Sequence, residues 1–489
     1  MRGRSKQILI GIVVVIVGLG LAYALALARS KARLRAAYAA LKQDGRPMRA
    51  ADVIPAAIPD TENAAPLYQK AARLLKEQPA PKNKHLLEHL AGLASSYVGG
   101  TLEPEERVEF DQVMAQEVVV SALATLEEAL QRPACRFDHD YDNGLYADVR
   151  AAQATHPLMR RRQDEFRPSD LRDLARLYEA RTWREVEAGR ASQAWGRVQR
   201  QFKCAEALSG QPVLSGHFPR FSIVRDLCRL MRRLCEVAPP DEENYQRLEA
   251  LLKDQSDVAS LVSAADAERL LRGQWLFSLP SDRLYEALQQ DGLFPSPEGV
   301  PEAFSRFGFR LATFRPRFIA AHAAYLEMMR RGAQMLEGPY FPRGSQTDQT
   351  FSSLAGHSLL TNRLAPMLQF EKEFHCDMVA QVQLTRAGLA LLRYRQTHGT
   401  FPDVLDALNL EDLVDPFAEA PLHYRAEEAG FVVYSVGEDQ QDNGGTPRQR
   451  RTTSDPRYKT PDYDLIWRFP RATDPAAGGD TQEKSAISG

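Results

Sequence analysis

The residues best suited to chemistry form one short string, His85-Leu86-Leu87-Glu88-His89. On a helix, the two histidines stand four positions apart and share one face, where their imidazoles would bind zinc. Glu88 would then activate a zinc-bound water molecule for hydrolysis. The string therefore predicts a zinc-dependent hydrolase as one alternative function, with His85, Glu88 and His89 as its site.

This string is similar to that of the inverted-zincin peptidases, and the resemblance implies a third, acidic ligand at Glu165. The glycine-rich lead-in and the two-lobed α/β body of that family are missing, and residues 79–84 read Pro-Ala-Pro-Lys-Asn-Lys instead. Because only three positions of the string are fixed, chance matches are common. A solvated helix without metal is therefore the favoured interpretation.

Two further clusters of polar residues have simpler explanations. Residues 138–144 hint at a calcium loop, but Asn143 stands where an EF-hand requires its sixth-position glycine, so a turn is the better interpretation. Glu371 and His375 lie four apart on a predicted helix and are able to share a metal, yet a site in a helical bundle needs ligands from other helices as well. A structural role is favoured for both clusters.

The elements that position these residues follow a membrane segment. From residue 8 to residue 28 every side chain is apolar, Gly or Tyr, and a helix of about 20 such residues matches the thickness of a bilayer. Basic residues precede the run, as in a signal sequence, but the run is longer than a typical signal peptide. We therefore expect an uncleaved, single-pass anchor, with cleavage as the alternative.

The basic residues on the two sides of this segment are too evenly matched to fix its orientation. Long domains cross the membrane largely regardless of their charge, so both placements of the body stay open. We take the extracytoplasmic side as the working expectation. The lipid bilayer around residues 8–28 is the predicted first partner, beside a protein partner that the sequence does not name.

Composition excludes several classes of protein. The chain has 489 residues, with 62 Lys and Arg against 64 Asp and Glu and a formal net charge of -2. This balance argues against a nucleic-acid-binding protein, and the length favours two or three domains. Five cysteines are too few and too scattered for a disulfide framework, and Cys228 and Cys235, seven apart on one helical face, are expected to be buried small hydrophobic residues.

Helical periodicity dominates the chain after the anchor. A helix over 29–43 continues out of the membrane, and a further helix opens near Asp60. The remaining helical patterns cover about 103–131, 169–188, 190–208, 219–237, 241–254, 257–274, 315–336 and 364–397. The pair of helices around Gly189 resembles one tetratricopeptide-type hairpin. Arg225, Arg229, Arg232 and Arg233 are expected to form a solvated face balanced by nearby acids.

The pattern changes near residue 399. Strands are predicted around residues 422–425, 431–436 and 464–469, where β-branched and aromatic residues are separated by turn residues. The fold class is therefore mainly α, with an N-terminal transmembrane helix, a body of helical hairpins and a small C-terminal α+β domain with an antiparallel sheet.

A series of short motifs runs through this C-terminal part. In order they are Tyr394-Arg395, Gly399-Thr400-Phe401-Pro402, Asp415-Pro416-Phe417, Tyr424-Arg425, Tyr434-Ser435-Val436-Gly437 and the acidic stretch 438–445. Residues 378–470 thereby resemble the globular domain of the major pseudopilin of type II secretion systems. The layout of the whole chain is similar to that of bacterial membrane-anchored envelope proteins.

In the pseudopilin family the acidic loop binds calcium, so the resemblance implies a calcium site here. Asp439 matches the first family carboxylate, and Asp442 and Asn443 are the other candidate ligands. Such oxygens suit a hard cation, but the family's later acidic run is replaced by residues 446–451, Thr-Pro-Arg-Gln-Arg-Arg. A solvated turn is the competing interpretation.

A true pseudopilin also has a processing site before its apolar helix and a glutamate within it, and this chain has neither. We therefore interpret the C-terminal part as a module carried by a different protein. The expected domains are a membrane anchor over 1–28, a helical body over 29–363, a pseudopilin-like α+β domain over 364–470 and a disordered tail over 471–489.

No glycine-rich phosphate loop, nucleophile elbow or Cys-x-x-Cys pair occurs in the sequence, so no catalytic residue is predicted and calcium is the sole candidate cofactor. The leading hypothesis is a membrane-anchored, non-enzymatic binding or structural protein of the bacterial cell envelope. The alternatives are the zinc hydrolase and a component of a secretion system of type II character.

Overall fold

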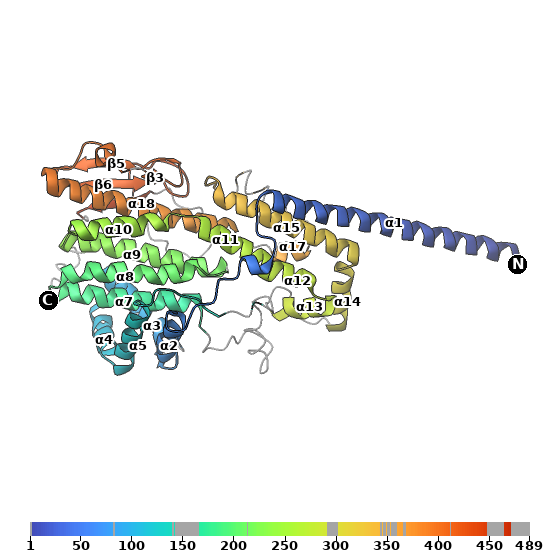
Figure 1. Ribbon diagram of the computed structural model, residues 1–489, viewed down its shortest axis with the longest axis horizontal. Coiled ribbons are helices and arrows are strands. Elements are labelled where there is room, and N and C mark those ends of the chain that lie inside the picture. Colours follow the sequence, from blue (N-terminus) through green and yellow to red (C-terminus); the bar gives the residue numbers. More distant parts are fainter. Residues whose placement is uncertain are drawn as a thin grey trace, which may run out of the picture.

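The computed structural model is mainly helical, with one long N-terminal helix and a small antiparallel sheet near the C-terminal end (Figure 1). It describes residues 2–81, 84–138, 141, 166–212, 214–290, 302–342, 345, 349, 353, 359–364, 368–410, 412–446 and 464–470. The predicted fold class is confirmed. The predicted tail over 471–489 lies outside the described residues.

Helix α1 (Arg2–Gln43) has two halves with different surroundings. The apolar side chains from Ile10 to Leu25 are exposed, and this is the one described helix that is long and apolar enough to cross a membrane. The second half packs against α15 (Arg315–Glu337), where Leu41 is fully buried. The helix therefore continues from the apolar run into the body without a break, as the sequence predicts.

The helical body stacks antiparallel helices side by side (Figure 1). Its first elements are α2 (Ala65–Lys76), β1 (Pro79–Ala80), β2 (Lys84–His85), α3 (Leu86–Gly99), α4 (Pro104–Met114) and α5 (Glu117–Ala129). They are followed by α7 (Pro168–Glu187), α8 (Ala191–Ser209), α9 (His217–Val237), α10 (Glu242–Gln255) and α11 (Ala259–Ala267). The predicted hairpin around Gly189 is formed by α7 and α8, which pack on each other and on α9.

The helices differ from the prediction in three ways. The pattern over 103–131 divides into α4 and α5, because the chain turns at Ala115 and Gln116. The pattern over 257–274 changes after α11 into a π-helix, η5 (Glu268–Gln274), which leads into α12 (Trp275–Ser278). Helices α3, α13 (Ser281–Gln290) and α14 (Glu302–Ala312) lie outside the predicted helical ranges.

The C-terminal sheet has the order β5-β6-β7, with β5 (His423–Glu427), β6 (Gly430–Ser435) and β7 (Leu465–Phe469) all antiparallel. A separate pair is formed by β3 (Val414–Asp415) and β4 (Ala420–Pro421). Every residue of β6 is buried, because the sheet lies on α18 (Leu368–His398), which α17 (Leu359–Leu364) precedes. Trp467 packs against Gly388 of α18, where an added methyl group would overlap the indole ring.

Helix α18 also belongs to the packing of the body. It lies along α9, where Arg225 pairs with Asp377 at 2.9 Å and Arg232 donates to Thr385 Oγ1 and to the carbonyl of Gln381. The guanidinium of Arg232 also lies over the Trp467 ring, 5.5 Å from its centre. The expectation of a solvated face on α9 is therefore wrong for Arg232, because this side chain joins the body to the sheet.

Candidate functional site

The proposed zinc string does not lie on one helix. His85 ends β2 and is the residue before α3, whereas Glu88 and His89 are inside that helix. Nε2 of His89 lies 2.8 Å from Oε1 of Glu109 on α4. The condition of the zinc hypothesis, two histidines on one helical face, is therefore not met.

Metal ligation has no support elsewhere in the described part of the chain, which contains no group of three His, Cys, Asp or Glu residues arranged to hold a metal ion. Glu165 lies outside the described residues, and so does most of the predicted turn over 138–144. Cys228 and Cys235 are buried and free, as predicted. Burial raises the pKa of both thiols.

The three predicted calcium ligands lie together in the loop after β6, and each is used to shape that loop. Oδ1 of Asp439 accepts from the backbone N–H of Gln441 at 3.1 Å. Oδ1 of Asp442 accepts from the N–H of Gly444 at 2.8 Å and from the Tyr434 hydroxyl at 3.1 Å. The Asn443 side-chain nitrogen donates to the Gln441 carbonyl at 3.1 Å.

A third acid, Asp464, is buried against this loop and immediately precedes β7. Its two oxygens accept from the N–H groups of Asn443 at 3.3 Å and Gly445 at 2.7 Å. Burial raises the pKa of Asp464, and these two N–H groups oppose that effect. The donor set fits calcium poorly, since its carboxylates already accept protein hydrogen bonds. The calcium site stays a prediction.

Asp415, the acid of the Asp-Pro-Phe motif, has a structural role that the sequence pattern does not show. It is fully buried at the end of β3. Its carboxylate accepts from the Phe417 N–H at 2.9 Å, the Ser435 hydroxyl at 2.8 Å and the Val436 N–H at 2.9 Å. It thereby joins the β3–β4 turn to the end of β6.

A second group of polar residues is buried where the first turns of α9 and α18 meet. His217 and His375 both lie beside the ring of Phe221. The centre of each imidazole ring is 5.9 Å from the centre of the Phe221 ring. Within the described residues, both ring nitrogens of His217, Nδ1 of His375 and Oε2 of Glu371 have no hydrogen-bond partner. Arg220, also buried, donates to Oε1 of Gln255 at 3.2 Å.

Burial sets the protonation of this cluster, which we call the α9–α18 polar cluster (His217, Arg220, Glu371 and His375). It lowers the pKa of His217 to about 3 and that of His375 to about 3, and the nearby Arg220 adds to both effects. It raises the pKa of Glu371 to about 8, with a contribution from Glu268. Shifts of this kind are frequent at functional sites and in structural networks alike.

A groove with a volume of about 970 Å³ lies beside the second half of α1, and this is within the usual size range of ligand sites. Its walls are α1 and α15, with contributions from the end of α14 and from α17. Most of its lining is alanine, with two arginines and a glutamate; the residues are Arg33, Ala36, Ala37, Ala40, Phe309, Thr313, Arg317, Ala320, Ala321, Ala323, Ala324, Glu327 and Leu360.

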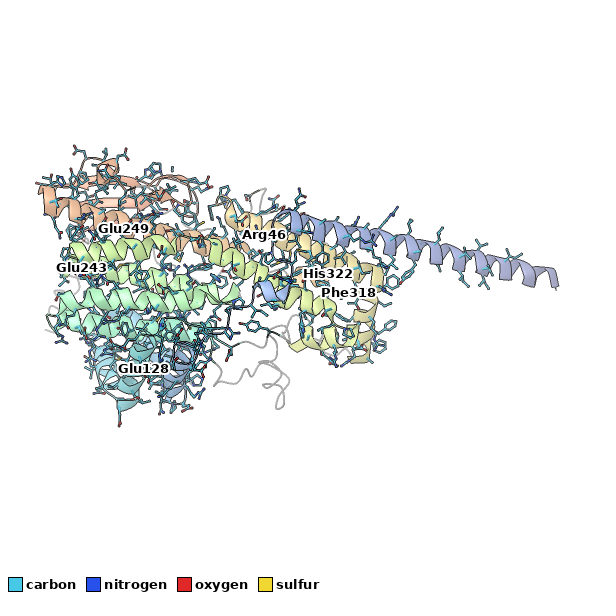
Figure 2. All side chains as sticks on the ribbon, viewed as in Figure 1. Arg46, Glu128, Glu243, Glu249, Phe318 and His322 are labelled. Atoms are coloured by element: carbon cyan, nitrogen blue, oxygen red, sulfur yellow. The ribbon has the colours of Figure 1, made fainter. Side chains whose placement is uncertain are left out.

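The groove keeps its shape because α1 is fixed to the body at its far end. Asp44 accepts from Arg330 at 2.9 Å, and Arg46 pairs with Glu337 at 2.8 Å and with Asp266 at 3.5 Å. Figure 2 shows Arg46 at this junction and His322 on α15 beside the neighbouring helices. The His322 ring stacks on Phe277 with their centres 4.5 Å apart, and burial lowers its pKa to about 4.

The comparisons with known proteins give no family: no protein-family model, no curated protein and no solved structure matches this chain. Sequence reasoning missed the groove, because its alanines are 280 or more positions apart on α1 and α15 and carry no chemical signature. It noticed Glu371 and His375 but not His217 or Arg220, which reach them only through the packing of α9 on α18.

Proposed function

We propose that this protein is a single-pass, membrane-anchored, non-enzymatic binding protein of the bacterial cell envelope, with its body on the extracytoplasmic side. The observation that carries the proposal is the continuity of α1. The same helix supplies a bare apolar stretch long enough to cross a bilayer and one wall of the groove.

The position of the groove favours a ligand that comes from the membrane surface. Arg33 lies five residues beyond the apolar run and Ala40 twelve, so the lining begins about 8 Å and ends about 18 Å from the membrane end of the helix. Alanine methyl groups suit an apolar chain, and Arg33 and Arg317 suit an anionic head group. An amphiphilic ligand fits this arrangement best.

Membrane attachment and sidedness are tested first. The full chain is expected to float with membranes and to resist extraction by alkaline carbonate. A reporter fused to the carboxy terminus is expected to be active on the extracytoplasmic side. A reporter active only in the cytoplasm would reverse the orientation and would leave the anchor itself intact.

The groove is tested with two substitutions on the same helix. Ala36 and Ala39 are both exposed on α1, but only Ala36 lines the groove. Native mass spectrometry of the full chain released from membranes should show a bound amphiphile on the wild type and on Ala39→Phe, and a loss of that mass on Ala36→Phe. Equal retention by all three proteins, or no bound mass on the wild type, would exclude a ligand groove.

A second candidate function is a component of a secretion system of type II character. It is supported by the ordered motifs of the C-terminal part, which occupy α18 and the β5-β6-β7 sheet that packs on it. Co-purification with secretion machinery is the expected result under this hypothesis. Normal protein export in a strain that lacks the chain would count against it.

A further inference from the structure

Exposed large apolar side chains outside the anchor are concentrated in one place. In the described residues they are Phe304, Phe307, Leu311 and Phe314, together with five single valines scattered over the rest of the surface. The first three recur at intervals of three and four residues along α14 and therefore share one face of that helix. Phe304 is 70% exposed and Phe307 61%.

The other face of α14 is packed on the protein. Phe309 is buried with its ring edge-on to Tyr285 of α13, 5.2 Å between ring centres. Arg310 pairs with Asp282 at 2.9 Å on the same side. The helix is thus attached to α13 through Phe309 and Arg310, and the exposed aromatic face is the side turned away from α13.

The exposed face lies at the level of the membrane end of the anchor. The ring of Phe314 is 5.3 Å from the ring of Tyr23, centre to centre. Tyr23 is inside the apolar run, five residues before its end at Ala28, so Phe314 lies about 8 Å below the membrane surface that this run defines. That depth matches the roughly 5–10 Å at which interfacial helices bury their apolar faces.

The direction of α14 agrees with this depth. Figure 1 shows α14 crossing the direction of α1 at the point where α1 leaves the body. A helix that crosses a membrane-spanning helix in this way lies along the membrane surface. Phe309, opposite the exposed apolar face, packs on α13, and Figure 1 shows α13 on the body side of α14. The exposed face is therefore turned to the side toward which α1 extends.

Charge near this face is positive. Arg29, Lys31, Arg33 and Arg35 follow the apolar run on α1, and Arg315 and Arg317 follow Phe314 on α15. All six side chains are exposed, and the described residues provide none of them with an ion-pair partner. Anionic lipid head groups would neutralise such a ring at the level where the apolar run ends.

We propose that α14 is an interfacial helix that inserts Phe304, Phe307, Leu311 and Phe314 into the bilayer crossed by α1, with the six cations in contact with anionic head groups. The chain then holds the membrane by two helices, which fixes the tilt of the body and places the groove at the head-group level. This inference rests on the proposed membrane anchor, so its test must separate the two.

The experiment uses the full chain in vesicles of phosphatidylethanolamine and phosphatidylglycerol. A photoreactive benzoylphenylalanine is placed at one of three positions: Val17 in the anchor, Phe307 on α14, or Val120, an exposed valine on α5 that serves as the matched control. After illumination, lipid adducts are expected at 17 and 307, with a yield at 307 about tenfold above that at 120, because an interfacial side chain faces acyl chains.

The other outcomes of the cross-linking experiment separate the interfacial helix from the anchor. Adducts at 17 but not at 307 would overturn the interfacial helix and leave the anchor standing. Adducts at neither position would overturn the anchor as well. Cross-linking of 307 to a second copy of the chain would show that the aromatic face is a protein interface. The three variants are first compared by thermal unfolding, and only those that unfold like the wild type are used.

Discussion

Two buried carboxyl groups in this protein, Asp415 in the C-terminal sheet and Glu371 in the body, have opposite surroundings. Asp415 accepts three hydrogen bonds from donors within 2.9 Å. Glu371 has one oxygen without a partner among the described residues, and its pKa is raised to about 8. The two side chains are buried to nearly the same extent, so the contrast between them lies in the hydrogen-bond donors that reach each carboxyl group.

The two regions use their buried acids in different ways. Donors aimed at a carboxylate replace its hydration, so a buried aspartate in the sheet is a structural bond between segments. Without such donors the charged form is costly and the group stays protonated. The C-terminal module therefore uses Asp415 as a satisfied acid, whereas in the α9–α18 polar cluster the charges of His217, His375 and Glu371 are suppressed by burial.

The largest effect on stability is expected at Asp415. Asp415→Ala removes the acceptor for two buried N–H groups and one hydroxyl, and we expect a loss of about 4 kcal/mol in the free energy of unfolding. Urea unfolding of the full chain measures this loss. Asp403→Ala, an exposed acid of the same region, is the matched control with a change near zero. A loss below about 1 kcal/mol would show that the three bonds do not hold the module together.

At Glu371 the same kind of change should have the opposite sign. The pKa of Glu371 is raised in the folded state, so the protonated carboxyl contributes its full stability below about pH 4.5. That contribution to the free energy of unfolding is lost as pH rises from about 4.5 through about 8. Glu371→Gln removes this penalty and should stabilise the protein by about 3 kcal/mol at pH 7 and hardly at all at pH 4. Thermal unfolding at both pH values measures it.

The control for that variant is Glu236→Gln, an exposed position on α9. It should shift the unfolding temperature little at either pH. A Glu371→Gln protein that is less stable than the wild type at pH 7 would show that the Glu371 carboxylate makes stabilising bonds that the glutamine amide does not replace.

The two buried histidines affect stability below neutral pH. Their folded-state pKa values are lowered to about 3, so the unfolded chain binds more protons, and stability is full above about 6.5 and lost as pH falls toward 3. In the Glu371→Gln background, His217→Phe should reduce the loss between pH 7 and pH 5 by about 2 kcal/mol. His398→Phe, at an exposed position, should leave that loss unchanged.

The smallest effect is expected at the acidic loop. Because Asp439 and Asp442 already accept hydrogen bonds from the loop, excess calcium should stabilise the chelator-treated protein by less than about 1 kcal/mol. Differential scanning calorimetry with and without calcium measures this. A larger shift that Asp442→Asn abolishes would establish the calcium site that the pseudopilin resemblance implies.

Periodic patterns carried most of the fold prediction. The apolar run, the hairpin around Gly189 and the strands near 423, 431 and 465 each depend on residues close together in the sequence, so local propensity and spacing were sufficient to find them. The π-helix over 268–274 and the aromatic helix α14 were missed. The first looks like an ordinary helical pattern, whereas the second carries Phe304, Phe307 and Leu311 at helical intervals, a local signal that could have found it.

Site prediction succeeded less well, for a related reason. The zinc string has the right residue types, but His85 precedes the helix that its motif assumes. The calcium ligands are neighbours, as expected, yet the loop uses their oxygens. A short motif specifies which groups are present, and only the backbone path decides where they point.

The long apolar helix, the helical body, the small sheet and the near-neutral charge could all be derived from the sequence, because they follow from local composition and periodicity. The tertiary structure alone decided which polar groups are satisfied, where α1 and α15 leave a groove and which level of the anchor α14 meets. Each of these depends on contacts between segments far apart in the chain, and no local pattern records them.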